Sequence, residues 1–236
     1  MHNLKRLKMI IKGKRRELEK NAASFIVNSL IKTIRKKGIA TLAIPGGKSV
    51  GGILKLLAKK KIPWQKVHIF MTDERLVSLN DKDSNYKLVY NILIKKLIRK
   101  NSLLKENFHP FVFTQKIDID IKNYERELKE VSDYFDVALL SSGEDGHIAA
   151  LFPNHETIKS RKEFFAYTNK SPKLPKERIS ASRKSLSKSD VSILLFFGKS
   201  KKQAFEDFNN SKLSIYDCHA KIVNQIKEHY ILVDLT

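Results

Sequence analysis

The sequence has a single cysteine, Cys218, among its 236 residues. One cysteine cannot form an internal disulfide, and it excludes most cysteine-based metal sites. No apolar run approaches the roughly 20 residues that a membrane-spanning helix requires. Residues 1–14 are basic and lack the apolar block and small-residue cleavage site of a signal peptide. We therefore expect a chain that has no membrane partner and stays in the cytoplasm, which is a reducing compartment.

The sequence also lacks internal repeats and low-complexity linkers, and no change in composition marks a domain boundary. With 42% apolar and 30% charged residues, the chain can bury a full hydrophobic core. We predict a single α/β domain over residues 1–236. Its basic N-terminal segment, residues 1–14, has no role that the sequence indicates.

Acidic residues are scarce relative to basic ones: 25 Asp and Glu stand against 46 Lys and Arg, and the formal net charge is +21. Basic proteins bind polyanions by neutralising phosphates. The lysines are spread along the whole chain, for example at Lys95, Lys96 and residues 59–61, and no single tract interleaves them with aromatic residues. We therefore expect no specific nucleic-acid partner. A nucleic-acid-associated protein without catalysis remains an alternative hypothesis.

Strand-like and helix-like segments alternate along the chain, which predicts an α/β fold with a parallel sheet and helices on both faces. Apolar runs predict strands over 39–44, 67–72, 108–113, 135–140, 164–168, 178–182, 191–197 and 229–235. Helical spacing of apolar residues predicts helices over 14–37, 53–58, 85–97, 120–133 and 199–209, with Ser84 and Asn85 as N-cap candidates for the third.

Polar residues follow four of the predicted strands directly: Gly46 to Ser49, Asp73 to Arg75, Asp145 to His147, and Gly198 to Lys201. In open α/β sheets, ligands bind beyond the carboxyl ends of the strands. A Gly-Gly turn between a strand and a helix also presents backbone N–H groups that favour a phosphate. The convergence of four strand ends therefore predicts one binding site.

The segment 134–153 carries the most specific chemistry. The run 135–140 is apolar without alternation, as in a strand that is buried on both faces. Asp145 and His147 follow it, and a carboxylate two residues from an imidazole can fix its tautomer and stabilise its protonated form. Gly146 between them allows the backbone to approach a ligand. We expect this pair to act as a general base near neutral pH.

Five blocks occur in order along most of the chain. They are 45–49 (Pro-Gly-Gly-Lys-Ser), 70–77 (Phe-Met-Thr-Asp-Glu-Arg-Leu-Val) with Ser84 and Asn85 downstream, 143–153 (Gly-Glu-Asp-Gly-His-Ile-Ala-Ala-Leu-Phe-Pro), 177–180 (Glu-Arg-Ile-Ser), and Gly198 with Lys201. In these blocks the sequence resembles the 6-phosphogluconolactonase family, within the group that includes glucosamine-6-phosphate isomerase/deaminase. The resemblance implies a three-layer α/β sandwich with a mostly parallel, modified Rossmann-type sheet.

The reaction that the resemblance implies is hydrolysis of 6-phosphoglucono-δ-lactone to 6-phosphogluconate in the oxidative pentose phosphate pathway, without metal or nucleotide. We expect the chain to be a monomer. His147 would activate water and return the proton to the ring oxygen, and Asp145 would orient the imidazole. Fixing the far end of the substrate would orient its carbonyl. The resemblance assigns the phosphate to Gly46, Gly47, Lys48, Ser49, Arg178 and Lys201, and it places Asp73 and Arg75 near the sugar.

The alternative within this group is the isomerase/deaminase, which shares the glycine loop and Asp-Gly-His. That branch has a glutamate before the proline, where this chain has Phe152 before Pro153. A sugar-phosphate-binding protein without catalysis is a further alternative. It is motivated by departures from the lactonase pattern: Val50 replaces a proline, Ser141 and Ser142 replace Gly-Met, and Ala150 replaces a serine. A left-handed backbone at position 141 would strain a serine.

Overall fold

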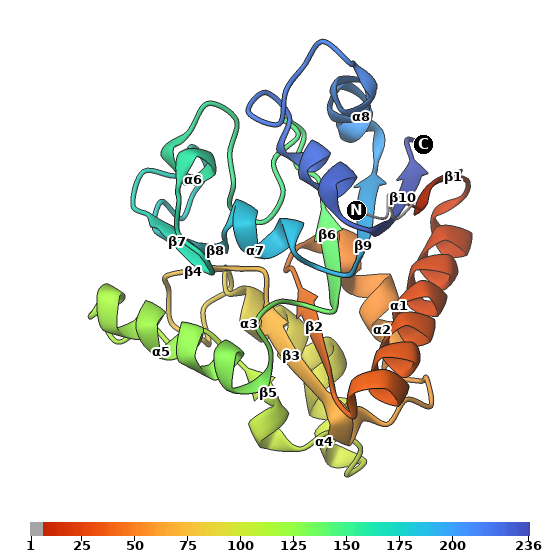
Figure 1. Ribbon diagram of the computed structural model, residues 1–236, viewed down its shortest axis with the longest axis vertical. Helices are drawn as coiled ribbons and strands as arrows, with labels where there is room; N and C mark the ends of the chain where they lie inside the picture. Colours follow the sequence, from red (N-terminus) through yellow and green to blue (C-terminus); the bar gives the residue numbers. More distant parts are fainter. Residues whose placement is uncertain (1–6) are drawn as a thin grey trace, which may run out of the picture.

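The computed structural model describes residues 7–236 and contains two β-sheets. The strands are β1 (Leu7–Lys12), β2 (Ala40–Ile44), β3 (Val67–Met71), β4 (Asp73–Arg75), β5 (Phe108–His109), β6 (Val137–Ser141), β7 (Phe165–Thr168), β8 (Arg178–Ala181), β9 (Val191–Phe197) and β10 (Glu228–Asp234). The large sheet has the order β1-β10-β9-β6-β2-β3-β5, and each neighbouring pair is parallel (Figure 1). The small sheet, β4-β8-β7, is antiparallel.

Helices connect the parallel strands, as crossover connections require. They are α1 (Arg15–Lys37), α2 (Gly51–Leu57), α3 (Asn85–Val89), α4 (Lys95–Arg99), α5 (Ile117–Val131), α6 (Glu156–Lys159), α7 (Arg183–Ser187) and α8 (Lys202–Asn209). A π-helical turn, Tyr90–Ile94, joins α3 to α4, and 3₁₀ turns occur at Lys48–Val50, Lys199–Lys201 and His219–Gln225. Among residues 7–236, no helix is long and apolar enough to cross a membrane.

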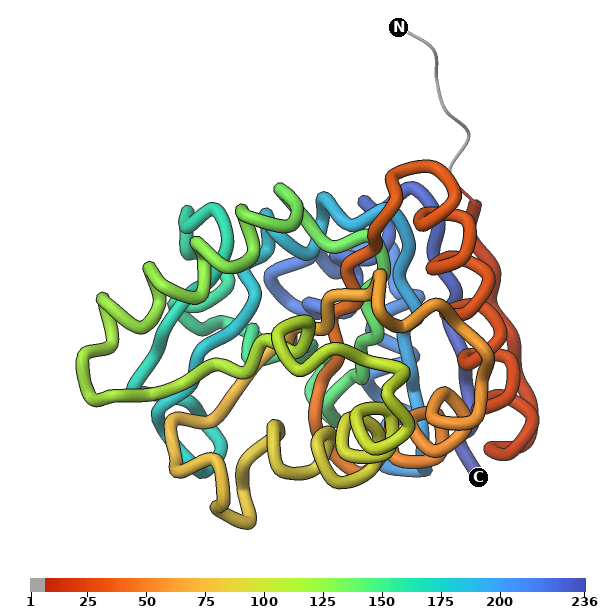
Figure 2. The backbone as a smooth tube through the Cα atoms, turned by 90° about the horizontal axis from the view of Figure 1, so that it is seen from below, coloured from red at the N-terminus to blue at the C-terminus, as the bar shows by residue number. Residues whose placement is uncertain are grey.

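The large sheet separates two hydrophobic cores, which gives the molecule three layers. Side chains alternate along a strand, so Leu42 and Ile44 of β2 lie in one core and Ala43 lies in the other. Residues of α1 to α4 complete the first core, and residues of α5, α7, α8 and the small sheet complete the second. In Figures 1 and 2, α1 and the small sheet accordingly lie on opposite sides of the molecule.

The strand order brings the polar strand ends together. β9, β6, β2 and β3 are consecutive neighbours in the large sheet, and they are the four strands after which the sequence predicted polar groups. The chain passes from β2 to β3 in one direction and from β6 to β9 in the other, so the order reverses between β2 and β6. A reversal of this kind leaves a crevice at the carboxyl ends of the strands.

The predicted three-layer α/β sandwich with a mostly parallel sheet is confirmed. The strand expected over 108–113 is shorter than predicted, because it ends at His109 before Pro110, which has no N–H for the ladder. The residues Asp73 to Arg75, predicted to follow a strand end, do so and form β4 of the small sheet.

Part of the basic N-terminal segment forms a strand that the sequence did not predict. Residues 7–12, for which the sequence indicated no role, form β1, an edge strand parallel to β10. Residues 1–6 of that segment lie outside the described residues. Apart from Ile11, every residue of β1 is exposed, so the strand shows no buried face in its sequence pattern.

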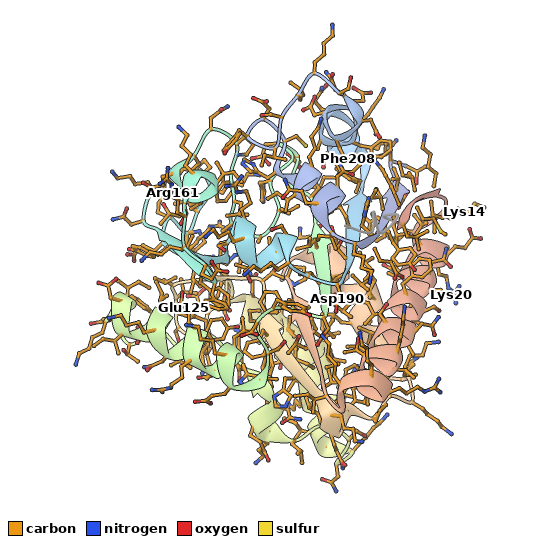
Figure 3. All side chains as sticks on the ribbon, in the orientation of Figure 1. Lys14, Lys20, Glu125, Arg161, Asp190 and Phe208 are labelled. Atoms are coloured by element: carbon orange, nitrogen blue, oxygen red, sulfur yellow. The ribbon has the colours of Figure 1, made fainter. Side chains whose placement is uncertain are left out.

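The basic side chains are spread over the surface, as their distribution in the sequence predicts. Lys20 on α1 and Arg161 before β7 are both exposed, and they point outward from opposite sides of the molecule (Figure 3). Basic side chains therefore occur on at least two sides of the described part of the molecule.

Candidate active site

A cleft of about 490 Å³ lies at the carboxyl ends of β9, β6, β2 and β3. This volume is suited to a small ligand. It is lined by every residue that the sequence assigned to the site except Asp145: Gly46, Gly47, Lys48, Ser49, Asp73, Arg75, His147, Arg178 and Lys201. The fold therefore brings together four strand ends and β8, which are far apart in the sequence.

Asp145 lies directly beside His147. Its Oδ1 is 2.5 Å from His147 Nδ1, and the same oxygen accepts the His147 backbone N–H at 3.3 Å. Because a carboxylate oxygen can only accept, Nδ1 is the donor of this hydrogen bond, and in the neutral ring the free lone pair is then on Nε2. The His147 side chain is 15% exposed, so the ring is largely buried while it lines the cleft. The pair can therefore accept a proton at Nε2.

The backbone around this pair depends on two glycines. Gly146 has φ +78, a left-handed angle that turns the chain so that residues 145 and 147 meet. A Cβ at Gly143 would lie 2.0 Å from His147 Nδ1 and 2.6 Å from Asp145 Oδ1. The imidazole therefore packs directly on the backbone of Gly143, in space that a side chain would occupy.

The charge of Asp145 is stabilised by its partners. Burial alone would raise the pKa of Asp145, but the hydrogen bond to His147 and the positive charges of His147 and Lys173 hold it well below its ordinary value. The carboxylate is therefore ionised throughout the physiological range. It can stabilise an imidazolium that forms when His147 accepts a proton.

Two arginines oppose each other at the cleft. Arg75 of β4 and Arg178 of β8 are partners in the antiparallel ladder, and both line the cleft. Like charges directly opposite each other in a sheet are destabilising. Burial and, after it, the charge of Arg75 lower the pKa of Arg178. An anion bound between the two guanidinium groups would relieve this repulsion, so the arrangement favours an anionic ligand.

The two arginines differ in how many of their donors are already used. Arg75 Nη1 donates to the Asp83 carbonyl at 2.5 Å, while its buried Nε has no hydrogen-bond partner among the described residues. Arg178, which is 4% exposed, donates from Nε and Nη2 to backbone carbonyls of residues 173–175. Arg178 thus also anchors the loop between β7 and β8.

Comparison with known proteins places the chain in a family. The model of the family described as glucosamine-6-phosphate isomerases/6-phosphogluconolactonase matches residues 13–231. The chain belongs to this family. The membership expected from the sequence is confirmed, and with it the prediction that the chain is an enzyme.

Individual family members are also similar. The 6-phosphogluconolactonase of Borreliella burgdorferi is 38% identical over 204 residues, which cover 86% of each chain. Probable 6-phosphogluconolactonase 5 of Arabidopsis thaliana is 32% identical over 73% of this chain and 75% of the plant protein. The crystal structure of the Thermotoga maritima 6-phosphogluconolactonase shares the fold, with a TM-score of 0.82 and 24% identity over 96% of this chain and 100% of that chain.

Acidic residues of β4 organise one wall of the cleft in this family member. Asn85 donates to the Asp73 backbone carbonyl at 2.9 Å and to its carboxylate at 3.0 Å. Glu74 accepts the backbone N–H groups of Arg75, Asn85 and Tyr86 at 2.7–2.8 Å. Burial raises the pKa of Glu74 to about 7, although these N–H donors lower it. Glu74 thereby fixes the start of α3 against β4. Ser84 is the N-cap, as the sequence predicted.

Three residues near the cleft were missed by reasoning from the sequence. Lys173 and Leu174 line the cleft from the loop between β7 and β8, and no local pattern distinguishes them from other surface residues of a lysine-rich chain. His219 is fully buried, and neither ring nitrogen has a hydrogen-bond partner among the described residues. Burial, followed by the charge of His147, lowers the pKa of His219 to about 4, so this ring is neutral at pH 7.

The departure from the lactonase pattern at Ser141 introduces no backbone strain. Ser141 is the last residue of β6 and is not among the described residues with positive φ, so no left-handed strain arises there. The backbone N–H of Ala150 donates to Ser180 Oγ at 3.0 Å.

No group of three or more His, Cys, Asp or Glu side chains is placed to hold a metal ion in the part of the chain that the structure describes.

Proposed function

We propose that this chain hydrolyses 6-phosphoglucono-δ-lactone to 6-phosphogluconate, with His147 as the general base. The observation that carries the proposal is the geometry of one cleft. An imidazole whose Nδ1 contacts a carboxylate lines the same cleft as the facing pair Arg75 and Arg178. An enzyme that hydrolyses the lactone of a sugar phosphate needs a site for the phosphate anion. It also needs a group that activates water, about the length of one hexose away from that site.

In the proposed reaction, Nε2 of His147 removes a proton from water as the water oxygen attacks the lactone carbonyl. Asp145 stabilises the imidazolium that results. The proton then passes to the ring oxygen as the ester bond breaks, which yields the open-chain acid. General base catalysis of this kind contributes ~10²- to 10⁴-fold, and positioning of the substrate supplies the rest.

The phosphate is assigned in this proposal to the loop Gly46 to Ser49 together with Arg178 and Lys201. Arg75, which faces Arg178, lies between this anion site and the sugar, and Asp73 contacts the sugar. Lys201 follows β9 and lines the cleft. Burial lowers the pKa of Lys201, and the negative charge of Glu144 opposes this shift. A phosphate would stabilise the charge of this ammonium. The proposal places the reaction in the oxidative pentose phosphate pathway and in the cytoplasm.

The residue before Pro153 supports a lactonase over an isomerase. The Phe152 ring lies 4.7 Å from the His147 ring and 5.6 Å from the Arg178 guanidinium, measured to ring centroids. A phenylalanine cannot carry a proton, whereas the resemblance assigns the isomerase branch a glutamate at this point. The lactonase names of the two curated relatives support the same branch.

A coupled assay with freshly generated lactone tests the proposal, and glucosamine 6-phosphate serves as the parallel substrate. We expect hydrolysis well above the spontaneous rate and no release of ammonia from the amino sugar. Ammonia release without accelerated lactone hydrolysis would assign the chain to the isomerase/deaminase branch and refute the proposal.

A further inference from the structure

The carboxylate of Asp145 has a second cationic partner besides His147. Lys173 Nζ lies 3.7 Å from Asp145 Oδ2, while His147 Nδ1 lies on Oδ1. The carboxylate therefore stands between an ammonium and an imidazole, with one oxygen for each. Lys173 lines the cleft, and it comes from the loop between β7 and β8 rather than from the segment that carries Asp145.

Buried groups hold the backbone of Lys173 in place. The Arg178 guanidinium donates to the carbonyls of Lys173 at 3.4 Å, Leu174 at 2.9 Å and Pro175 at 3.0 Å. The backbone N–H of Lys173 donates to Ser171 Oγ at 3.2 Å, and Ser171 is fully buried. The ammonium is thus carried on an anchored stretch of chain, although its own side chain is 43% exposed.

The position of this ammonium has a consequence for His147. A carboxylate beside an imidazole favours the protonated ring, and a protonated ring cannot accept a proton from water. A second cation beside the carboxylate of Asp145 weakens its stabilisation of the protonated ring, because this cation compensates part of the carboxylate's negative charge. An ammonium near Oδ2 also favours the rotation of the carboxylate in which Oδ1 contacts Nδ1.

We propose that Lys173 is a positioning residue for the Asp145–His147 pair: its ammonium, near Oδ2 of Asp145, keeps Oδ1 directed at Nδ1 of His147 and opposes protonation of the ring. This proposal rests on the proposed role of His147 as a base. Lys173 acts through Asp145 and needs no contact with the substrate.

Other ionisable groups surround the pair and remain the same in any variant of Lys173. Glu144 precedes Asp145 in the chain, and Lys201 lies in the turn after β9. The His155 ring contacts the Phe152 ring, which in turn contacts the His147 ring. Asp217 and the buried His219 come from the segment before β10, where the Ala220 N–H donates to the Gly146 carbonyl at 2.9 Å.

The test compares Lys173→Met with Lys173→Arg and with Lys176→Met, which removes an exposed lysine of the same loop. Two quantities are measured: the pH dependence of kcat/KM for lactone hydrolysis, and the NMR titration of the His147 ring without substrate. For Lys173→Met we expect both the acid limb and the ring titration to move to higher pH by ~0.5 unit. We expect Lys173→Arg to restore the wild-type midpoint and Lys176→Met to leave it unchanged.

Two results would overturn the proposal. An increase in KM without movement of either titration would make Lys173 a substrate contact, and a loss of thermal stability without such movement would make it a structural residue. The NMR titration needs no activity, so it separates the two proposals. If the wild-type chain fails to hydrolyse the lactone and the ring titration still moves in Lys173→Met, the proposed function fails while the effect of Lys173 on His147 stands.

Discussion

At the scale of single residues, the site depends on how closely the His147 ring approaches the backbone. The ring occupies the space next to the Cα of Gly143, and its Nδ1 faces Asp145. The imidazole is thus held from two sides, by a carboxylate and by a backbone without a side chain. Small changes at position 143 should therefore act on catalysis directly.

Gly143→Ala should reduce kcat for lactone hydrolysis by ~10²-fold, because the added Cβ displaces the ring and misplaces Nε2. KM should change little, since the phosphate site is separate. The matched control is Gly13→Ala, where the nearest atoms to a new Cβ lie at an ordinary 3.7 Å. Full activity in Gly143→Ala, measured by the coupled assay, would show that the ring position does not govern the rate.

At the scale of elements, the pairing of β4 with β8 creates the cationic wall of the cleft. Each of the two strands carries one arginine. Arg75 and Arg178 face each other only because β4 and β8 pair in this register. The repulsion between them is a cost to the unliganded protein that an anion removes. Binding of an anion should therefore raise the stability of the fold.

Inorganic phosphate should stabilise the wild-type protein by ~1.4 kcal/mol at ten times its dissociation constant. In Arg75→Met most of this effect should be lost, while the unfolding temperature without phosphate changes little because a like-charge contact is relieved. The measurement is thermal unfolding with and without phosphate at matched ionic strength. Arg161→Met, at an exposed position away from the cleft, is the control (Figure 3). Equal phosphate stabilisation in Arg75→Met would exclude Arg75 from the anion site.

The contact between β4 and α3 should depend on pH through Glu74. Burial raises the pKa of Glu74 to about 7 from 4.5, so the folded state binds this proton more tightly than the unfolded state. The stabilisation is therefore complete below pH 4.5 and is lost as the pH rises through 7.

Urea unfolding at pH 5 and pH 8 tests this account against Glu74→Gln, which stays neutral at both values. The wild type should lose ~2.5 kcal/mol of its free energy of unfolding relative to the variant between the two conditions. All other groups titrate alike in both proteins, so they cancel in the comparison. A difference in stability that is the same at both pH values would contradict the assigned cause.

At the scale of the whole molecule, the alternation of strands and helices was sufficient to predict the fold class and the convergence of four strand ends. The features that were missed depend on pairing between distant segments. β1 is an exposed edge strand, and its sequence Leu-Lys-Met-Ile-Ile-Lys lacks the strict alternation that would mark a strand with one buried face. Helices α6 and α7, with four and five residues, are too short to show a helical period. The contact of Lys173 with Asp145 depends on a loop that Arg178 anchors, and no local sequence signal encodes it.

The central claim is that His147 activates water in this cleft, and kcat of His147→Asn for lactone hydrolysis tests it most directly. After the spontaneous hydrolysis is subtracted, we predict that kcat falls by ~10²- to 10⁴-fold. The thermal stability of the variant should be unchanged. His68→Asn, on β3 and outside the cleft lining, should retain the wild-type rate. A folded His147→Asn protein that hydrolyses the lactone at the wild-type rate would contradict the account.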